Sequence, residues 1–268
     1  MTTRSMSRLL ARVAVLAVAS VALCGCDVMV GMGDFGGREL AKDQWKKSYP
    51  LSAGGQLEII NVNGSIVTEA TDGAVVEVAA ERSAKAGTIE AARDLLKQIQ
   101  IREEAAPDRV SIEVRPPTGF KVSTSVNFVV GVPRGAALRL SNTNGKITVV
   151  GAKGAVRAEV TNGGVTGRGL AGTVNASTTN GSISVDLDAV AGDEIKLGTT
   201  NGSIQLTLPA SARAEIRASC VNGSVNAANL SLEHRGAQSR RRLDATLNGG
   251  GVRIDLDTTN GGIKLTGK

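Results

Sequence analysis

Aromatic and histidine side chains are scarce in this chain, whose 268 residues include one Trp, one Tyr, three Phe and one His. The interior of the folded protein is therefore left to Val, Ile, Leu and Ala, residues that suit thin stacked layers of β-structure. With His234 as the single histidine and no nucleophile-elbow motif, the sequence offers no Ser-His-Asp triad. We assign no catalytic residue.

Cysteine is also scarce, and two of the three cysteines lie in an N-terminal segment that is typical of a secretory signal. Residues 1–25 combine three arginines with an uncharged apolar run, Val13–Leu23, which is too short to favour a permanent membrane span. The segment ends in Leu-Cys-Gly and then Cys26, which resembles the bacterial lipobox. This resemblance implies that Cys26 is lipidated and becomes the mature N-terminus. An ordinary secreted protein or a signal anchor is the alternative.

Removal of this signal changes the cysteine count and the charge. If Cys24 leaves with the signal and Cys26 is acylated, Cys220 is the one remaining thiol and no intramolecular disulfide can form. The formal net charge of +6 falls to about +3, because the three signal arginines leave as well. So small a positive charge does not indicate a nucleic-acid partner.

The dipeptide Asn-Gly recurs along the chain and marks an internal repeat. The steps between Asn144 and Asn222 are 18, 18, 21 and 21 residues, which fit one solenoid coil each and are too short for a propeller blade. The eight marks are Asn63, Asn144, Asn162, Asn180, Asn201, Asn222, Asn248 and Asn260.

Apolar residues stand at fixed distances from these marks. Seven of the eight repeats have an aliphatic residue six positions before the mark and another three positions after it, and Asn248 is the exception. A further apolar residue, four positions before the mark, alternates with polar or small neighbours, and this period of two predicts strands with one buried face. Each repeat is therefore a strand that enters Asn-Gly and a strand that leaves it.

The alignment of these columns distinguishes two folds. A two-residue hairpin would explain any one pair of strands, because Asn-Gly tolerates the positive φ of a sharp turn. Columns that stay aligned across repeats instead favour coils stacked on coils, and we predict an all-β fold, a parallel β-solenoid with Asn-Gly corners. Cys220, two positions before its mark, is then expected to be buried.

Stacked coils would place the corner asparagines above one another, where their side-chain amides can form a hydrogen-bonded ladder. We expect this ladder to be architectural rather than chemical. Its predicted members are Asn144, Asn162, Asn180, Asn201, Asn222 and Asn260.

The part of the chain before the regular repeats has a different organisation. We expect residues 26–54 to be a lipid-anchored tether, residues 55–135 to form N-terminal strands with a capping helix and a hairpin, and residues 136–268 to be the solenoid repeats. Apolar residues at i, i+3, i+4 and i+7 after Thr88, a suitable N-cap, predict the helix. It is expected to cover an open end of the solenoid, since exposed end strands invite self-association.

Taken together, these features resemble one bacterial family. A lipidated N-terminus, a short helix, the segment VNFVVGVPRGAALRLSNTNGKITV and the recurring TNGSI turns are similar to the putative-adhesin β-solenoid proteins of the DUF4097 type. The resemblance covers roughly residues 55–268 and implies the fold, whereas the family has no agreed catalytic residues to carry over. The chain departs from the family pattern at Leu232–Gly251, where we expect a loop that leaves the coil.

A polysaccharide-active enzyme is the weaker alternative. Solenoids that cleave acidic polysaccharides use clustered carboxylates with calcium, and the best candidates in this sequence are Asp186, Asp188, Asp193 and Glu194. The next repeat offers no carboxylates in the corresponding stretch, so no column of oxygen ligands builds up for a hard cation. We expect no enzymatic activity, no metal and no cofactor.

The function that these residues favour is that of a non-catalytic lipoprotein of the bacterial cell envelope, facing the periplasm or the exterior, whose solenoid presents a binding or adhesion surface. A passive structural protein without a dedicated ligand is the alternative. The unusual patch is Arg240, Arg241 and Arg242, because adjacent guanidinium groups bind phosphate or carboxylate bidentately.

The expected partners are the membrane, through the lipid on Cys26, and an envelope protein or an anionic glycan or lipid. Asp27 follows the lipidated cysteine, and its resemblance to the lipoproteins of enteric bacteria favours retention at the inner membrane.

Overall fold

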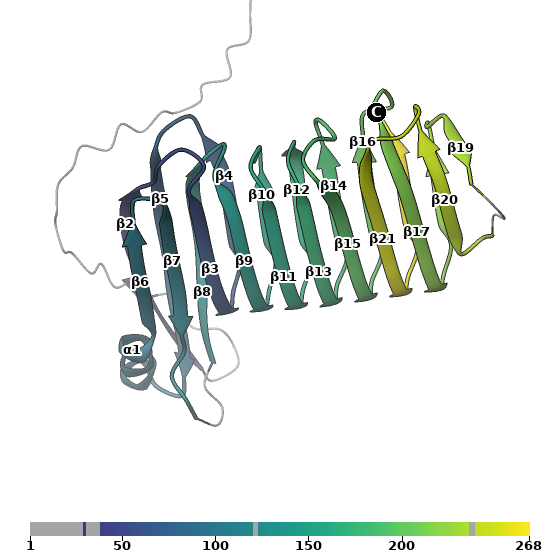
Figure 1. The fold of residues 1–268 in the computed structure, drawn as a ribbon. Helices are drawn as coiled ribbons and strands as arrows, with labels where there is room; N and C mark the ends of the chain where they lie inside the picture. The colour runs from purple at the N-terminus through teal and green to yellow at the C-terminus, as the bar shows by residue number, and fades with distance from the viewer. Residues whose placement is uncertain (1–28, 31–37, 120–122, 236–238) are drawn as a thin grey trace, which may run out of the picture.

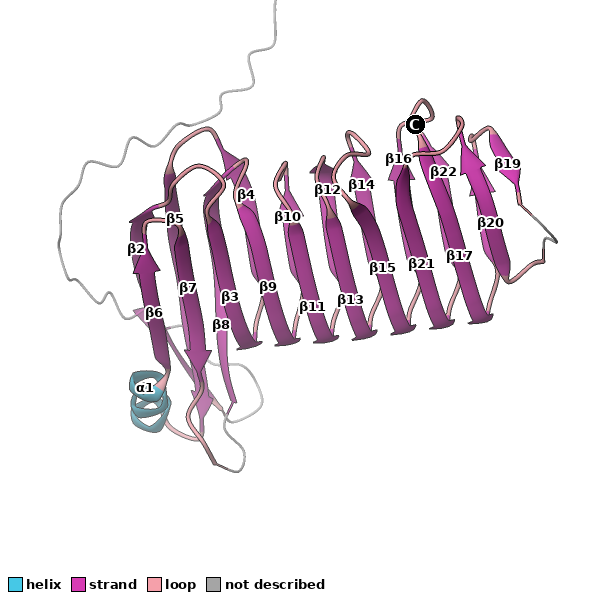
Figure 2. Cartoon of the chain, in the orientation of Figure 1, coloured by secondary structure: helices cyan, strands magenta, loops and turns pink. Residues whose placement is uncertain are grey.

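A computed structural model describes residues 29–30, 38–119, 123–235 and 239–268. Within them the chain forms two eleven-stranded sheets that face each other and enclose one hydrophobic core, together with one helix, α1 (Ile89–Gln98). Figures 1 and 2 show the strands side by side in a single row, from the N-terminal strands at one end to β19 and β20 at the other.

The strands are given below in their order in space. The first sheet contains β1 (Met29–Val30), β2 (Glu39–Pro50), β5 (Val75–Ala86), β8 (Ser123–Pro133), β4 (Ile66–Thr71), β10 (Ile147–Val150), β12 (Val165–Leu170), β14 (Ile183–Leu187), β16 (Ile204–Leu208), β22 (Ile263–Gly267) and β18 (Val225–Ala228). The second sheet contains β19 (Leu232–His234), β20 (Arg242–Leu247), β17 (Ala214–Asn222), β21 (Val252–Asn260), β15 (Glu194–Asn201), β13 (Val174–Asn180), β11 (Val156–Asn162), β9 (Ala137–Asn144), β3 (Gln56–Asn63), β7 (Arg109–Arg115) and β6 (Gln100–Ala106).

The predicted parallel β-solenoid is confirmed, and each coil has two strands. A strand of the second sheet runs into an Asn-Gly corner, and a strand of the first sheet leaves it. The column six positions before the corner is at most 4% exposed in every coil, because these side chains point between the sheets. Its members are Leu57, Leu138, Val156, Val174, Ile195, Ile216 and Ile254.

We name each coil after its corner asparagine. Neighbouring coils pair in parallel with equal positions side by side, as Val174 pairs with Ile195 and Ile183 with Ile204. The order in space nevertheless differs from the order in sequence, since the Asn260 coil (β21, β22) lies between the Asn201 coil (β15, β16) and the Asn222 coil (β17, β18).

The expected tether is wrong from Glu39 onward. Residues 39–50 form β2, which pairs antiparallel with β5 along its whole length, and Ala41 and Tyr49 are buried. The next inward position after Ala41 holds Asp43, whose carboxylate accepts hydrogen bonds at 2.7 and 2.5 Å from the guanidinium of Arg82 on β5. This pair satisfies a charge that is only 8% exposed.

The predicted helix and hairpin are present at the same end. Thr88 is the N-cap of α1, because its Oγ1 accepts from the backbone N–H of Ala91 at 3.2 Å. Ala92 and Leu96 are buried, and the helix packs against β5 and β2. β6 and β7 form the antiparallel hairpin. Figure 1 shows α1 lying beyond the line of the Asn-Gly corners at the N-terminal end of the row.

The expectation of a loop at Leu232–Gly251 is also wrong. The segment contains β19 and β20, and β20 pairs antiparallel with β17 on the outer side of the Asn222 coil. Leu243, Ala245 and Leu247 of β20 are buried. In place of a further repeat, β20 covers the end of the second sheet.

Candidate functional site

The corners of the seven coils form one straight edge of the molecule, which we call the corner edge. It is the lower edge of the row of strands in Figures 1 and 2. With about 4.8 Å between neighbouring strands, seven coils give an edge roughly 30 Å long.

An amide ladder runs along the corner edge. The Nδ2 of each asparagine donates to the Oδ1 of its neighbour, at 2.8 or 2.9 Å in all six steps. All six asparagines that the sequence assigns to the ladder take part, and Asn63 adds one coil at the N-terminal end. In space the order is Asn63, Asn144, Asn162, Asn180, Asn201, Asn260 and Asn222.

The glycine after each asparagine is required mainly by the contact between coils. A Cβ on Gly181 would lie 1.9 Å from the carbonyl oxygen of Gly163, and one on Gly202 would lie 1.8 Å from that of Gly181. Neither Gly181 nor Gly202 has a φ in the left-handed region, although Gly145 and Gly163 do, with φ of 135° and 146°. The close approach of stacked backbones therefore selects glycine even where no positive φ does.

A second column lies just inside the edge, two positions before each corner. Thr178, Thr199 and Thr258 are buried, and each donates its hydroxyl to a glycine carbonyl of the neighbouring coil at 2.8 or 2.9 Å. Cys220 occupies the same column in the Asn222 coil and is a free, buried cysteine, as the sequence predicts.

A third column faces the solvent, one position before each corner. It holds five threonines in adjacent coils, and no hydrogen bond joins any of their hydroxyl groups to another described residue. In space this threonine row consists of Thr143, Thr161, Thr179, Thr200 and Thr259, all exposed. Val62 and Val221 stand in the same column in the two terminal coils, and Val221 is 58% exposed. This row is not among the predicted columns, because its residues are polar, although the repeated letters T-N-G mark it in the sequence.

The three arginines lie where the corner edge ends. The backbone carbonyl of Arg240 accepts from the N–H of Val225 at 2.8 Å, and that of Arg241 accepts from the N–H of Cys220 at 2.9 Å, so the segment flanks the Asn222 corner. Arg242 begins β20. All three side chains are exposed, and none of them forms an ion pair within the described part of the chain.

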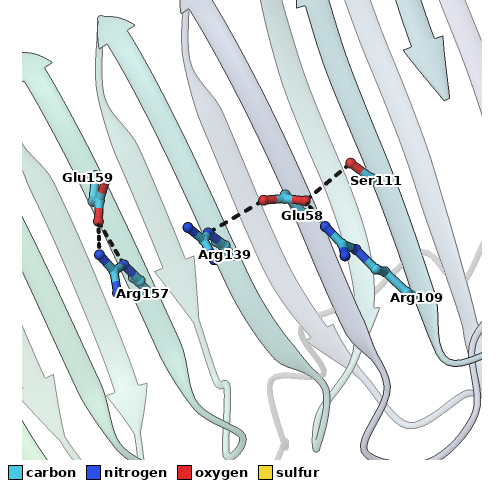
Figure 3. Close-up of polar contacts among 6 residues, drawn as sticks. All are labelled: Glu58, Arg109, Ser111, Arg139, Arg157 and Glu159. Carbon is cyan, nitrogen blue, oxygen red and sulfur yellow. Dashed lines mark hydrogen bonds and ion pairs between the residues drawn. The ribbon is translucent and has the colours of Figure 1, made fainter. Parts of the chain in front are cut away.

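The outer face of the second sheet carries a different polar cluster (Figure 3). The side chain of Glu58 is 12% exposed, accepts from Arg109 at 2.5 Å and from Ser111 at 3.3 Å, and forms an ion pair with Arg139 at 3.4 Å. In the next coil Arg157 pairs with Glu159, as Figure 3 also shows. Two glutamates here offset two of three arginines, and the cluster therefore offers less free positive charge to a ligand than Arg240, Arg241 and Arg242 do.

Two of the four carboxylates considered for an enzyme, Asp186 and Asp188, pair with Lys268, whereas the side chains of Asp193 and Glu194 form no ion pair within the described ranges. The Nζ of Lys268 lies 2.6 Å from Asp186 and 3.0 Å from Asp188, and the hydrogen bond to Asp186, followed by that to Asp188, raises the pKa of Lys268. No group of three or more His, Cys, Asp or Glu side chains among the described residues is arranged to hold a metal ion.

The N-terminal predictions lie outside the described residues. These are the signal segment 1–25, the lipidation of Cys26 and the role of Asp27. The one helix in the described ranges, α1, is neither long nor apolar enough to cross a membrane.

Comparison with known proteins identifies a family and a fold. The sequence profile of the family described as Toastrack DUF4097 matches residues 135–266. A structure described as a "putative cell adhesion protein" from Clostridium sporogenes is 12% identical, with a TM-score of 0.50 over 84% of this chain and 100% of that one. A "putative adhesin" from Bacteroides fragilis is 11% identical, with a TM-score of 0.37 over 84% of this chain and 97% of that one. No curated protein matches the sequence significantly.

Proposed function

The chain belongs to the DUF4097 family, whose profile covers the solenoid repeats at residues 135–266, and we propose that it is a non-catalytic binding protein of the bacterial cell envelope. Its contact surface is the corner edge, and its ligand is an anionic glycan of the envelope. The cell-adhesion description of the Clostridium sporogenes structure, which shares the fold, supports a role of this kind.

The observation that carries the proposal is the threonine row beside the amide ladder. The core does not require these threonines, because their side chains point into solvent and bond to no described residue. The row and the ladder together form a straight series of hydroxyl and amide groups with the spacing of the coils. Such a series can donate to and accept from the repeated hydroxyl and carboxylate groups of an extended polysaccharide.

The arginines at the end of the edge favour an anionic glycan over a neutral one. Arg240, Arg241 and Arg242 are exposed and have no carboxylate partner among the described residues. Three such charges at about 1 kcal/mol each would strengthen binding on the order of 100-fold at low salt. This gain should fall as salt is added, because exposed charges are screened.

The envelope location depends on the lipid. We propose that Cys26 carries it and that residues 26–38 link it to β2, with Asp27 favouring the inner membrane. Cells fed a fatty-acid analogue should label the wild-type protein and leave a Cys26→Ser variant unlabelled. Equal labelling of the two proteins would contradict lipidation at Cys26 without bearing on the corner edge.

The binding proposal is tested with two matched variants. Thr161, Thr179 and Thr200 are changed to Val, the residue that already ends the row at Val221. The control changes three outward threonines of the first sheet to Val, namely Thr148, Thr166 and Thr207. We expect the corner variant to lose most of its binding to immobilised polygalacturonate, and the control to retain it.

A third variant separates the glycan from a lipid. Changing Arg240, Arg241 and Arg242 to Ser should weaken polygalacturonate binding at low salt more than binding to phosphatidylglycerol vesicles. Unchanged melting temperatures show that the variants fold. If the wild type does not bind the polysaccharide, or if the corner variant binds like the wild type, the passive structural role is favoured instead.

A further inference from the structure

The Asn260 coil is out of sequence order in the stack. The chain passes from β16 of the Asn201 coil to the Asn222 coil, which lies two coil positions away, and forms β19 and β20 beyond it. Residues 248–251 then lead back to β21 and β22, which occupy the position between those two coils. We call this position the slot; its walls are the Asn201 coil and the Asn222 coil.

The slot holds its coil by contacts that are the same on both sides. Gly202 donates its N–H to the carbonyl of Asn260, and Gly261 donates to that of Asn222, both at 2.9 Å. The two steps of the amide ladder are both 2.8 Å. Ile254, Leu256, Ile263 and Leu265 of the inserted coil are at most 1% exposed. An empty slot would therefore expose four strand edges, those of β15 and β17 in one sheet and of β16 and β18 in the other, together with part of the core, which makes it a strong acceptor for a matching coil.

One short connector joins the coil to the rest of the chain. It is Asn248-Gly249-Gly250-Gly251, with φ of 48°, 80° and 83° at the first three residues. The Nδ2 of Asn248 donates to the backbone carbonyls of Ala210 and Ala212 at 2.9 and 2.7 Å and holds the connector in place. Three consecutive glycines give the connector access to many other conformations, including extended ones.

From these relationships we propose that the slot also accepts the Asn260 coil of a second copy of this chain, so that two copies exchange these coils reciprocally. Every contact inside the slot is then remade between the copies, because the incoming coil has the same sequence. The difference between the two forms is confined to the connector and to the entropy of association, so protein concentration during folding decides between them. The exchanged dimer presents two corner edges, which raises avidity for a repetitive surface.

A single substitution reports which chain fills the slot. Thr258 and Cys220 are partners across β21 and β17, both buried, and strands at this spacing fall within the Cα range of a disulfide. Thr258→Cys is introduced into the mature chain, from residue 26, with Cys26→Ser. Cysteine already occupies this column at position 220, so the variant is compatible with the fold.

The variant is unfolded, refolded at low and at high protein concentration, and oxidised. We expect an intramolecular crosslink at low concentration, and at high concentration a dimer that survives denaturation until it is reduced. A crosslink that stays within one chain at every concentration overturns the proposal. Three residues inserted after Gly250 should relax the connector and lower the dimer fraction, whereas deletion of Gly250 should raise it.

A second measurement does not depend on the disulfide. Tagged and untagged chains with native Thr258 and Gly250 are mixed either before or after refolding at high concentration. Tagged–untagged dimers that arise only in the co-refolded sample and persist on dilution indicate exchange. If no dimer forms, or if mixed dimers form without unfolding, reciprocal exchange is wrong.

Discussion

The amide of Asn260 donates its Nδ2–H to the Oδ1 of Asn201 at 2.8 Å, although 59 residues separate the two in sequence. Asn222, which follows Asn201 by one repeat in the chain, makes its ladder contact with Asn260 instead. The ladder thus records the order of the coils in space.

The ladder predicts unequal losses at its middle and at its end. Asn180 takes part in two amide bonds and Asn222 in one. We expect Asn180→Ala to lower the free energy of unfolding by about 1–2 kcal/mol and Asn222→Ala by roughly half as much. Urea denaturation of the two variants measures this, and equal losses would contradict the ladder as a source of stability.

Gly198 and Gly202, at the middle and the corner of the same coil, are expected to differ in how far an added methyl group destabilises the protein. In Gly202→Ala the new Cβ would lie 1.8 Å from the carbonyl oxygen of Gly181, whereas a Cβ on Gly198 would meet nothing within 4 Å. The backbones of two coils have to separate in the first case, and we expect a loss of about 3 kcal/mol or more. Gly198→Ala should change stability by less than about 1 kcal/mol, in either direction. Thermal melting distinguishes the outcomes, and similar losses would show that coil contact does not select glycine.

Two adjacent residues of β16 test the inward and outward faces. Ile204 is fully buried, and Gln205 is exposed on the outer face. Ile204→Asp buries a charge without a partner and should destabilise the protein by at least several kcal/mol. Gln205→Asp should change stability by no more than about 0.5 kcal/mol. Similar shifts in melting temperature would refute the assignment of faces.

Tyr49 predicts a dependence of stability on alkaline pH. Its hydroxyl donates to Glu103 on β6, and burial, followed by this hydrogen bond and the charge of Glu103, raises the pKa of Tyr49 above its ordinary value near 10. The folded state therefore favours the protonated phenol. The resulting stability is complete below pH of about 10, the pKa in the unfolded chain, and is lost as pH rises toward the folded pKa.

The chain contains one tyrosine, so phenolate absorbance reports this group alone. We expect its titration midpoint to lie above 10 in the folded protein and near 10 in urea. The unfolding free energy of the wild type should fall above pH of about 10 relative to that of Tyr49→Phe. Coincident midpoints in the two states would show that the contact with Glu103 does not hold the phenol.

The local structure was predictable because each column repeats. Apolar residues of period two specify the buried face, and Asn-Gly specifies the corner, so the fold and the ladder residues follow from the sequence. The spatial order of the last two coils does not. Ile254 and Ile216 are equivalent, and so are Asn260 and Asn222, so either coil could stack on the Asn201 coil. What distinguishes them is β20, whose antiparallel pairing with β17 covers the outer edge of the Asn222 coil in the second sheet.

β2 was not predicted, for a different physical reason. One of its inward positions holds Asp43, and a charged residue is expected to be exposed unless its partner, in this case Arg82, is known. That partner lies 39 residues away, so no local pattern reports it. The threonine row was missed because a solvent-facing column leaves no hydrophobic signal.

The ladder also has a direction. Every Nδ2–H points toward the N-terminal end of the row and every accepting Oδ1 toward the other end, so seven amide dipoles add along one axis. The corner edge is therefore polarised, with its negative pole at Asn222. A cation is stabilised at such a pole for the reason that it is stabilised at the C-terminus of a helix. Arg240 and Arg241 flank that pole, so the field of the whole edge stabilises their positive charges.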